Sequence, residues 1–152
     1  MKKSAGLLLY RKINKEIEFL LVHPGGPFWK NKDLNSWSIP KGEFTDDENP
    51  LDAARREFSE ETGISCDGDF IELSPLKQRS GKLVYAFAIK KNINEESIKS
   101  NLFEMEWPPK SGKYQSFPEV DKANWFTTND ARQKIVAGQA GFIDELIDKL
   151  EE

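Results

Sequence analysis

The feature that most constrains this chain is the segment from Gly42 to Ile64, in which three glutamates are spaced for one side of a helix. Glu57, Glu60 and Glu61 stand three and four positions apart, or side by side, and such residues are close together on an α-helix surface. Like charges at this spacing weaken a helix by about 0.2–0.5 kcal/mol per pair. We therefore predict a positive partner among them, and carboxylate oxygens are hard ligands that suit Mg²⁺ or Mn²⁺.

The same segment carries signals that start and stop a helix. Asn49 is a residue type that caps a helix start, and Pro50 suits the first helical position because its missing N–H needs no partner there. Gly63 stands where a left-handed residue commonly ends a helix. The face that can be buried, beside the glutamates, consists of Leu51, Ala54, Phe58 and Thr62.

Taken together, these residues resemble the Nudix box. The matching positions are Gly42, Glu48, Arg56, Glu57, Glu60, Glu61 and Gly63, with apolar Phe58 and Ile64. The resemblance implies an α/β fold, the α/β/α sandwich of Nudix proteins with a mixed β-sheet, and a hydrolase that cleaves pyrophosphate linkages. The box is a small part of the chain, so the other segments are argued separately.

The resemblance also implies roles for individual box residues. The carbonyl of Gly42 and the carboxylates of Glu57, Glu60 and Glu61 would hold divalent ions, Mg²⁺ or Mn²⁺. A glycine suits the first of these positions, because without a Cβ its backbone can come close to an ion. Arg56, together with Glu48, would orient the ligands. The alternative is an exposed helix face with salt bridges, which Gly42 and Glu48 argue against.

Glu119 is the candidate acid outside the box. It precedes Trp125 by six residues, and this placement is similar to that of a downstream acid in diadenosine tetraphosphate hydrolases and other Nudix enzymes. The resemblance implies a fourth metal ligand or the general base, with a solvated loop acid beside Lys122 as the alternative. Glu104 and Glu106 compete for the same role. The proton acceptor therefore stays open between Glu119 and a box glutamate.

Substrate contacts are expected from one cation and from aromatic rings. Lys41 precedes Gly42, where an ammonium can meet a phosphate oxygen. Trp37 and Tyr114 are our candidates for stacking on a nucleobase, worth about 1–3 kcal/mol per base, and packing within the protein is the alternative for each. Further rings in or next to loops are Phe28, Trp29 and Trp107. His23, the sole histidine, is expected to be packed or exposed rather than a catalytic base.

Length and charge predict one domain with a small substrate. The 152 residues, 38% hydrophobic, suffice for a single core, so we expect one domain over 1–152. A net charge of −4 argues against long nucleic acid, including RNA ends, but not against a small phosphorylated molecule. Cys66 is the only cysteine, which favours a reducing, cytoplasmic location. We expect no targeting segment and no membrane span.

Apolar patterning predicts a mixed sheet with helices on it. The expected strands are Ala5–Arg11, Glu16–His23, Ser36–Ile39, Asp69–Arg79, Lys82–Lys90, Phe103–Trp107 and Ala123–Thr127, with a hairpin at Asn14-Lys15. Besides the box helix, we expect helices from Thr128 to about Val136 and from Phe142 to the C-terminus. Pro108–Pro118 is expected to be a loop.

The combined expectation is a metal-dependent hydrolase in which water attacks phosphorus in a nucleoside polyphosphate. The segment from Ser4 to Glu43 is similar to Nudix proteins related to diadenosine polyphosphate hydrolases and predicted nucleoside triphosphate pyrophosphohydrolases. Dinucleoside tetraphosphates and nucleoside triphosphates stand equal as substrates. The alternative is a catalytically silent Nudix-fold module that senses a nucleotide. The oligomeric state is left open.

Overall fold

Two long strands at the N-terminus form the centre of the sheet. The computed structural model describes residues 2–151, so the ends of the predicted domain, Met1 and Glu152, lie outside the described residues. Strands β1 (Lys3–Ile13) and β2 (Glu16–Pro24) pair antiparallel. Asn14 and Lys15 between them have φ of 50° and 72°, the left-handed values that a two-residue hairpin turn requires. The predicted hairpin is confirmed.

Further strands extend this pair into a mixed sheet. They are β3 (Lys41–Phe44), β4 (Ile71–Glu72), β5 (Leu76–Lys77), β6 (Leu83–Lys90) and β9 (Val120–Thr127). The main order is β4-β6-β1-β2-β9, with β3 paired to β1 and β5 paired to β6. Strand β6 runs parallel to β1, whereas the other pairs are antiparallel. Both central strands are apolar on each face, as expected for a sheet covered on both sides.

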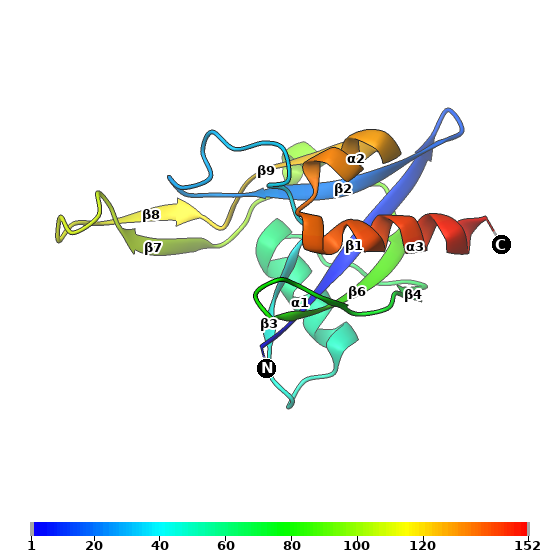
Figure 1. Ribbon diagram of the computed structural model, residues 1–152, viewed down its shortest axis with the longest axis horizontal. Helices are drawn as coiled ribbons and strands as arrows, with labels where there is room; N and C mark the ends of the chain where they lie inside the picture. Colours follow the sequence, from blue (N-terminus) through cyan, green and yellow to red (C-terminus); the bar gives the residue numbers. More distant parts are fainter. Residues whose placement is uncertain (1, 152) are drawn as a thin grey trace.

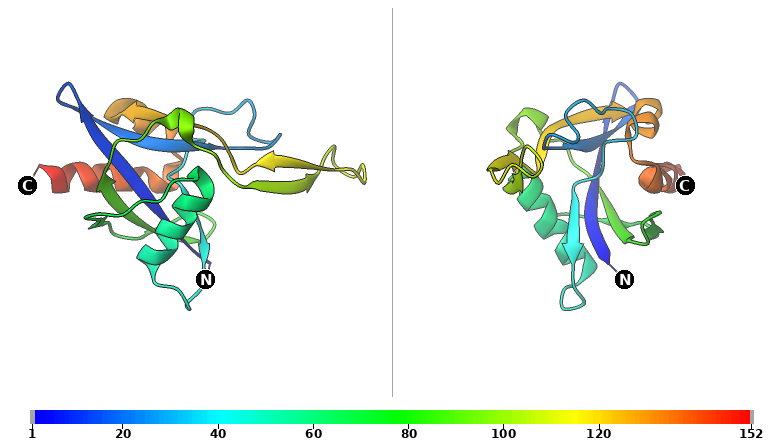
Figure 2. Two further views of the ribbon diagram at one scale, coloured as in Figure 1. Left: turned by 180° about the vertical axis from the view of Figure 1, so that it is seen from behind. Right: turned by 60° about the vertical axis from the view of Figure 1, so that its left-hand side comes forward.

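Helices cover the two faces of the sheet. They are α1 (Pro50–Thr62), α2 (Thr128–Lys134) and α3 (Ala140–Leu150), with short 3-10 turns at η1 (Glu95–Ser97) and η2 (Ala137–Gln139). Leu7 of β1 belongs to the cluster with Phe58 of α1, whereas Leu8 belongs to the cluster with Phe142 of α3. The turned view in Figure 2 places α1 and α3 on opposite sides of β1. The expected α/β/α sandwich with a mixed sheet is confirmed.

A two-stranded arm departs from the body of the sandwich. Strands β7 (Leu102–Glu106) and β8 (Tyr114–Pro118) pair antiparallel and project away from the layers (Figure 1). The expectation of a loop over Pro108–Pro118 is therefore wrong in its second half, which is strand β8. The strand pattern was weak here, because most of β8 is exposed and polar.

Other expected elements differ from the structure in detail. The strand expected over Asp69–Arg79 is two separate two-residue strands, β4 and β5. Ser36–Ile39 makes isolated bridges, Val22 to Ser38 and Trp37 to Ile135, rather than a strand. Pro75, which has no N–H to donate, stands between β4 and β5, and Pro40 follows directly after Ile39. No helix within residues 2–151 has the length and apolar character needed to cross a bilayer.

Candidate active site

Helix α1 is fixed at both ends by the residues that its sequence predicts. The Asn49 side chain accepts from the backbone N–H groups of Leu51, at 2.9 Å, and Asp52, at 3.4 Å. Gly63 has φ of 75°, and its N–H donates to the Ser59 carbonyl at 2.7 Å. A left-handed residue at this position closes the last turn of a helix. The glutamates of α1 therefore sit on a rigid, capped helix whose other face packs against the sheet.

Gly42 lies against the carboxylate of Glu57. It belongs to β3, where it pairs with Ala5 of β1. A Cβ at Gly42 would fall 1.9 Å from Oε2 of Glu57, far inside van der Waals contact. The strand and the helix can approach this closely only because the residue is glycine. The backbone of Gly42 and the carboxylate of Glu57 thus lie side by side.

Arg56 organises three acids around itself. Its Nε and Nη2 donate to the two carboxylate oxygens of Glu48, both at 2.9 Å. Its Nη1 donates to Oε1 of Glu57 at 2.8 Å and to Oε1 of Glu60 at 3.3 Å. The bond from Arg56 lowers the pKa of Glu48 below its usual value, and these partners raise the pKa of Arg56. The predicted positive partner among the glutamates is therefore Arg56, and its guanidinium group orients two of them, Glu57 and Glu60.

The remaining acids face the same region and repel one another. Burial raises the pKa of Glu61 to about 8, with Glu57 and Glu119 adding to the rise and Lys41 opposing it. Burial also raises the pKa of Glu57, with further contributions from Glu60 and Glu119 that Arg56 opposes. The pKa of Glu119 rises through burial and through the charge of Glu60. Carboxylates that raise each other's pKa in this way can be neutralised by a cation.

The acidic side chains of this cluster do not converge on one common point. Within residues 2–151, no three His, Cys, Asp or Glu side chains converge in a geometry that would hold a metal ion. Glu57 and Glu60 instead bond to Arg56. The oxygen donors are nevertheless of the hard type, and the backbone of Gly42 lies directly against the Glu57 carboxylate.

Lys41 stands beside the carboxylates at the start of β3. Its side chain is half-buried, and its charge opposes the rise in the pKa of Glu61. Burial lowers the pKa of its ammonium, and the nearby charge of Lys82 lowers it further, whereas Glu61, Glu43 and Glu57 raise it. The pairing of this ammonium with a phosphate oxygen stays a prediction.

A cavity of about 350 Å³ opens between these residues and the loop after β2. One side carries Lys41, Glu61 and Glu119. The apolar wall consists of Val22, Pro24, Trp29, Ile39, Val120 and Val136, and the polar wall of Ser36, Ser38, Gln78 and Gln139. A largely apolar hollow with a few placed polar groups is the usual form of a small-molecule site.

Gln139 is a polar residue of this cavity that the sequence analysis did not single out. Its side chain is fully buried, and its Oε1 accepts from the backbone N–H of Ile39 at 3.1 Å. Its Nε2 donates to Oγ of Ser38 at 3.1 Å. The signal that could have revealed it is a glutamine among small residues between two apolar segments, Ile135–Val136 and Phe142–Ile143. Such a buried amide is held by its partners and presents fixed donors.

The two predicted stacking rings lie elsewhere. Trp37 is only 3% exposed, with its ring edge-on to His23 and Phe126 and its Nε1 bonded to Asp33. It is therefore a core residue and presents no free face to a base, which corrects our expectation. Tyr114 is 69% exposed, but it lies on β8 of the arm and not in the cavity with Lys41.

The other candidates from the sequence also have clear positions. His23 is fully buried, with Nε2 donating to the Lys32 carbonyl at 2.7 Å and Nδ1 lying 2.9 Å from Oδ1 of Asp121. It is packed, one of the two placements expected. Glu106, a competitor for the acid role, accepts from backbone N–H groups at the tip of the arm. Glu104 is exposed on β7.

Comparison with known proteins identifies a family model and relatives that this chain matches. A family model described as NUDIX domain matches residues 2–146. Bis(5′-nucleosyl)-tetraphosphatase [asymmetrical] of Caenorhabditis elegans is 40% identical over 63 residues, which cover 41% of this chain and 41% of that protein. Nudix hydrolase 7 of Arabidopsis thaliana is 28% identical over 114 residues, covering 70% of this chain and 38% of that protein. The matches thus span about two fifths of the length of these relatives.

Solved structures share the fold over nearly the whole chain. A C. elegans Ap4A hydrolase binary complex matches with a TM-score of 0.66 and 24% identity, covering 99% of this chain and 98% of that one. The NUDIX domain of Shewanella oneidensis NrtR, complexed with ADP ribose, also gives a TM-score of 0.66, with 16% identity, over 97% of this chain and 87% of that one. At these identities the likeness concerns the fold alone.

Proposed function

The chain belongs to the Nudix family, and on that premise we propose that it is a hydrolase of phosphoanhydride bonds in nucleoside polyphosphates, dependent on Mg²⁺ or Mn²⁺. Dinucleoside polyphosphates and nucleoside triphosphates are the substrates that we put forward. The observation that carries the proposal is that Glu61, Glu119 and Lys41 meet at one side of a cavity of about 350 Å³. Acids for a metal and a cation for phosphate thus line a hollow large enough for part of a nucleotide.

The residues present fit a divalent ion. We assign its binding to the carbonyl of Gly42 and the carboxylates of Glu57, Glu60 and Glu61, with Glu119 as a further ligand. The fit is supported by the space that only a glycine leaves beside Glu57, and by the burial that raises the pKa of Glu57 and Glu61, to which repulsion from neighbouring acids adds. When bound, the ion would neutralise charge on phosphate oxygens and lower the pKa of a coordinated water.

The chain's own groups would orient the site and handle charge and protons. Arg56 holds the carboxylates of Glu57 and Glu60 in position through its Nη1, while both oxygens of Glu48 hold its other nitrogens. The ammonium of Lys41 would pair with charge that develops on the transferred phosphoryl group. Glu119, or else a box glutamate, would accept the proton from the attacking water.

The choice of substrate class draws on the C. elegans relative, whose name is that of a tetraphosphatase acting on bis(5′-nucleosyl) compounds. Its 40% identity extends over 63 residues, so it supports dinucleoside polyphosphates as the first substrates to test. The apolar wall of the cavity, with Trp29, would suit a base next to the phosphates.

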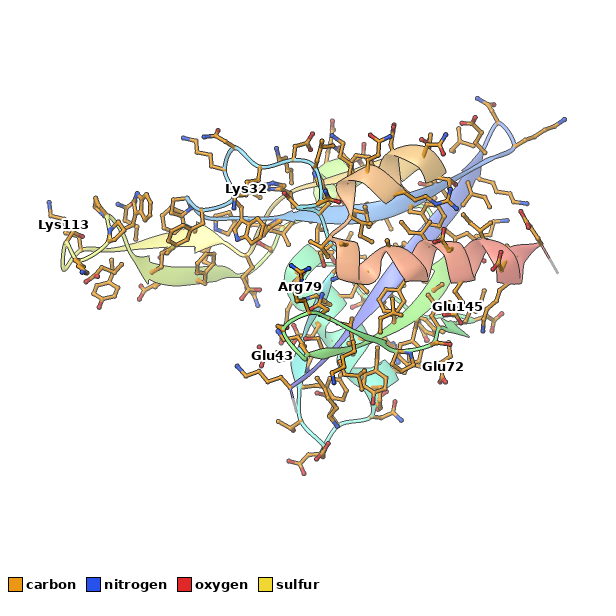
Figure 3. The ribbon with its side chains drawn as sticks, in the orientation of Figure 1. Lys32, Glu43, Glu72, Arg79, Lys113 and Glu145 are labelled. Atoms are coloured by element: carbon orange, nitrogen blue, oxygen red, sulfur yellow. The ribbon has the colours of Figure 1, made fainter. Side chains whose placement is uncertain are left out.

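The test is product analysis of the purified protein with Mg²⁺ or Mn²⁺. The substrates are dinucleoside polyphosphates, nucleoside triphosphates, nucleotide sugars and nicotinamide dinucleotides, with a chelator control. We expect metal-dependent release of nucleotide or pyrophosphate from one of the first two classes. Glu60→Gln should lower turnover at least about 100-fold without unfolding, and Glu72→Gln, a matched exposed glutamate on β4 (Figure 3), should leave it unchanged.

Absence of turnover with both metals would overturn the proposal. If nucleotides then still bound to the protein, the catalytically silent nucleotide-sensing module would replace the hydrolase. Wild-type turnover in Glu60→Gln would remove this residue from the mechanism and leave the hydrolase itself standing.

A further inference from the structure

The loop after β2 connects the cavity with the arm through two consecutive aromatic residues. Trp29 lines the cavity, whereas the ring of Phe28 packs edge-on against Trp107 at the end of β7, with 5.5 Å between ring centroids. Phe28 is 59% exposed and Trp29 is 36% exposed. Aromatic surface left this accessible beside a site commonly binds a ligand. The rings therefore form a path that leads out of the cavity and onto the arm.

The two faces of the arm differ in chemistry. Residues directly opposite one another on two paired strands point to the same face, and successive residues along one strand point to opposite faces. Tyr114 therefore lies on the same face as its partner Glu106, and Glu104 also lies on that face. The next pair is Trp107 with Lys113, joined by a backbone bond of 2.9 Å, and it lies on the opposite face. One face is thus acidic, whereas the face toward Phe28 combines an aromatic ring with a lysine.

The loop adds a second lysine to the aromatic side. Lys32 has its Nζ 5.1 Å from the centre of the Trp29 ring. Figure 3 shows Lys32 in the loop and Lys113 at the tip of the arm. We call this set the distal surface, and it consists of Phe28, Trp29, Lys32, Trp107 and Lys113. Rings that can stack on a base, with lysines beside them for phosphate, are the combination that binds nucleotides without a sequence code.

The distal surface is held at a fixed offset from the catalytic acids. At the base of the arm, the N–H of Asn101 donates to the carbonyl of Glu60 at 3.1 Å, and the N–H of Glu119 donates to the carbonyl of Asn101 at 2.9 Å. The N–H of Gly25 in turn donates to the carbonyl of Glu119 at 3.0 Å. The same two acids that face the metal region therefore anchor both the arm and the loop through their backbones.

The tip of the arm is ordered by its own hydrogen bonds. The carboxylate of Glu106 accepts from the N–H of Lys110 at 2.8 Å and from that of Gly112 at 3.2 Å. The side chain of Gln115 donates to the Trp107 carbonyl at 3.1 Å. An isolated two-stranded hairpin is marginally stable in water. These hydrogen bonds restrict the motion of the tip before a ligand binds, so binding loses less free energy to the ordering of the tip.

We propose that the distal surface binds the second nucleoside of a dinucleoside polyphosphate whose first nucleoside occupies the cavity. This inference rests on the proposed function, and it makes dinucleoside polyphosphates the preferred substrates over nucleoside triphosphates. The second base stacks on Phe28 and Trp107, and Lys32 and Lys113 pair with the outer phosphates. A net charge of −4 favours a short ligand over RNA.

The experiment compares two substrates that differ by one nucleoside. Diadenosine tetraphosphate and adenosine 5′-tetraphosphate carry the same number of phosphates, and only the first has a second base. Phe28→Ala should lower kcat/KM for the dinucleotide about tenfold and leave kcat/KM for adenosine tetraphosphate unchanged. Leu102→Ala, which removes a side chain that is 65% exposed on the opposite face of the arm, should change neither value.

Three results would overturn the inference. The first is an equal loss on both substrates in Phe28→Ala. The second is a dinucleotide-specific loss in Tyr114→Ala but not in Phe28→Ala, which would place the base on the other face. The third is a loss in Phe28→Ala confined to 5′-triphosphorylated RNA. If the wild type hydrolyses neither compound, calorimetric binding of the same two compounds to wild type and Phe28→Ala still decides the inference. The proposed function itself fails only if the wider set of substrates also shows no turnover.

Discussion

Helix α1 and the arm differ in what holds them in place. The α1 site is built into the sandwich: the apolar face of the helix packs on the sheet, and Arg56 links Glu48, Glu57 and Glu60. The arm touches the body at its base and is ordered further out by hydrogen bonds of its own, such as those of Glu106. Packing against the core fixes the geometry of α1, whereas hydrogen bonds within the arm fix the geometry of the arm.

This difference suggests a division of labour. Groups that handle metal and phosphate need a scaffold that keeps them within fractions of an ångström, and a capped, packed helix provides it. A surface that selects among substrates can stand on an element with few buried contacts, where changes do not disturb the core. Variants in α1 should therefore affect turnover on every substrate, and variants in the arm should affect one substrate class.

Gly42→Ala is expected to have the largest effect. The new Cβ would lie 1.9 Å from the Glu57 carboxylate, so the strand or the acid must move. A displacement of this kind should lower kcat/KM at least about 100-fold on all substrates. The measurement is steady-state kinetics on the dinucleotide and the mononucleotide. Gly141→Ala in α3 is the control, because its Cβ would meet only the end of the Leu76 side chain, at 3.2 Å, and activity should persist. A loss limited to one substrate would contradict the division between the regions.

Arg56→Gln should come next in size. Without its fork, Glu57 and Glu60 lose the donor that orients them, and loss of such an orienting partner typically costs 10- to 100-fold in metal affinity. We expect the Mg²⁺ concentration for half-maximal activity to rise about 10- to 100-fold. The neighbouring variant Arg55→Gln, which removes a donor to the Cys66 carbonyl, should leave the metal requirement unchanged. If Arg56→Gln left the Mg²⁺ concentration for half-maximal activity unchanged, the carboxylates of Glu57 and Glu60 would not need Arg56 to hold their positions.

The sequence predicts the first region better than the second for a physical reason. The caps Asn49 and Gly63 and the spacing of Glu57, Glu60 and Glu61 are local signals that act within a few residues, and the helix follows them. The neighbourhood of Glu119 depends on how β9 enters the sheet, so only the family resemblance suggested it. The role of Glu119 as ligand or base stays a prediction.

Aromatic residues show the limit of sequence reasoning most clearly. Trp37 and Trp29 both lie in or next to predicted loops, yet the first is in the core and the second lines the cavity. Nothing local distinguishes them, because burial is decided by contacts with distant residues such as Phe126. Strand β8 was missed for a similar reason: its partner β7 determines it, while its own residues lack an apolar alternation.

Glu106→Ala tests whether the arm depends on its internal bonds. Removing the carboxylate leaves the N–H groups of Lys110 and Gly112 without their acceptor, so their hydrogen exchange should accelerate. The Tm should change little because the tip is exposed, while KM for the dinucleotide should rise about two- to tenfold with kcat unchanged. Glu104→Ala, on the same face but outside the tip, is the matched control for exchange. A large drop in Tm would mean that the arm contributes to the core.

Asp33→Asn has the smallest expected effect and shows how the loop between the two regions is tied to the body. The bond from Lys134 lowers the pKa of Asp33 below 3.8, and the bond from Nε1 of Trp37 adds to this. A carboxyl whose pKa is lower in the folded than in the unfolded state stabilises the fold above its unfolded pKa, and this contribution is lost as pH falls through the folded value. The variant should therefore melt below wild type at neutral pH, by no more than about 3 °C because the pair is exposed.

The two melting curves of that comparison should converge at low pH. At pH 7 the wild type keeps the ionised Asp33, and below its lowered pKa both proteins carry a neutral side chain there. Asp148→Asn, an exposed acid of α3, controls for removal of one negative charge. A difference that persists unchanged at a pH low enough to protonate Asp33 would assign the effect to a cause other than the ion pair. The loop that carries Phe28 would then be held by packing in the core, as α1 is. Only the arm beyond Asn101 would then depend on hydrogen bonds of its own.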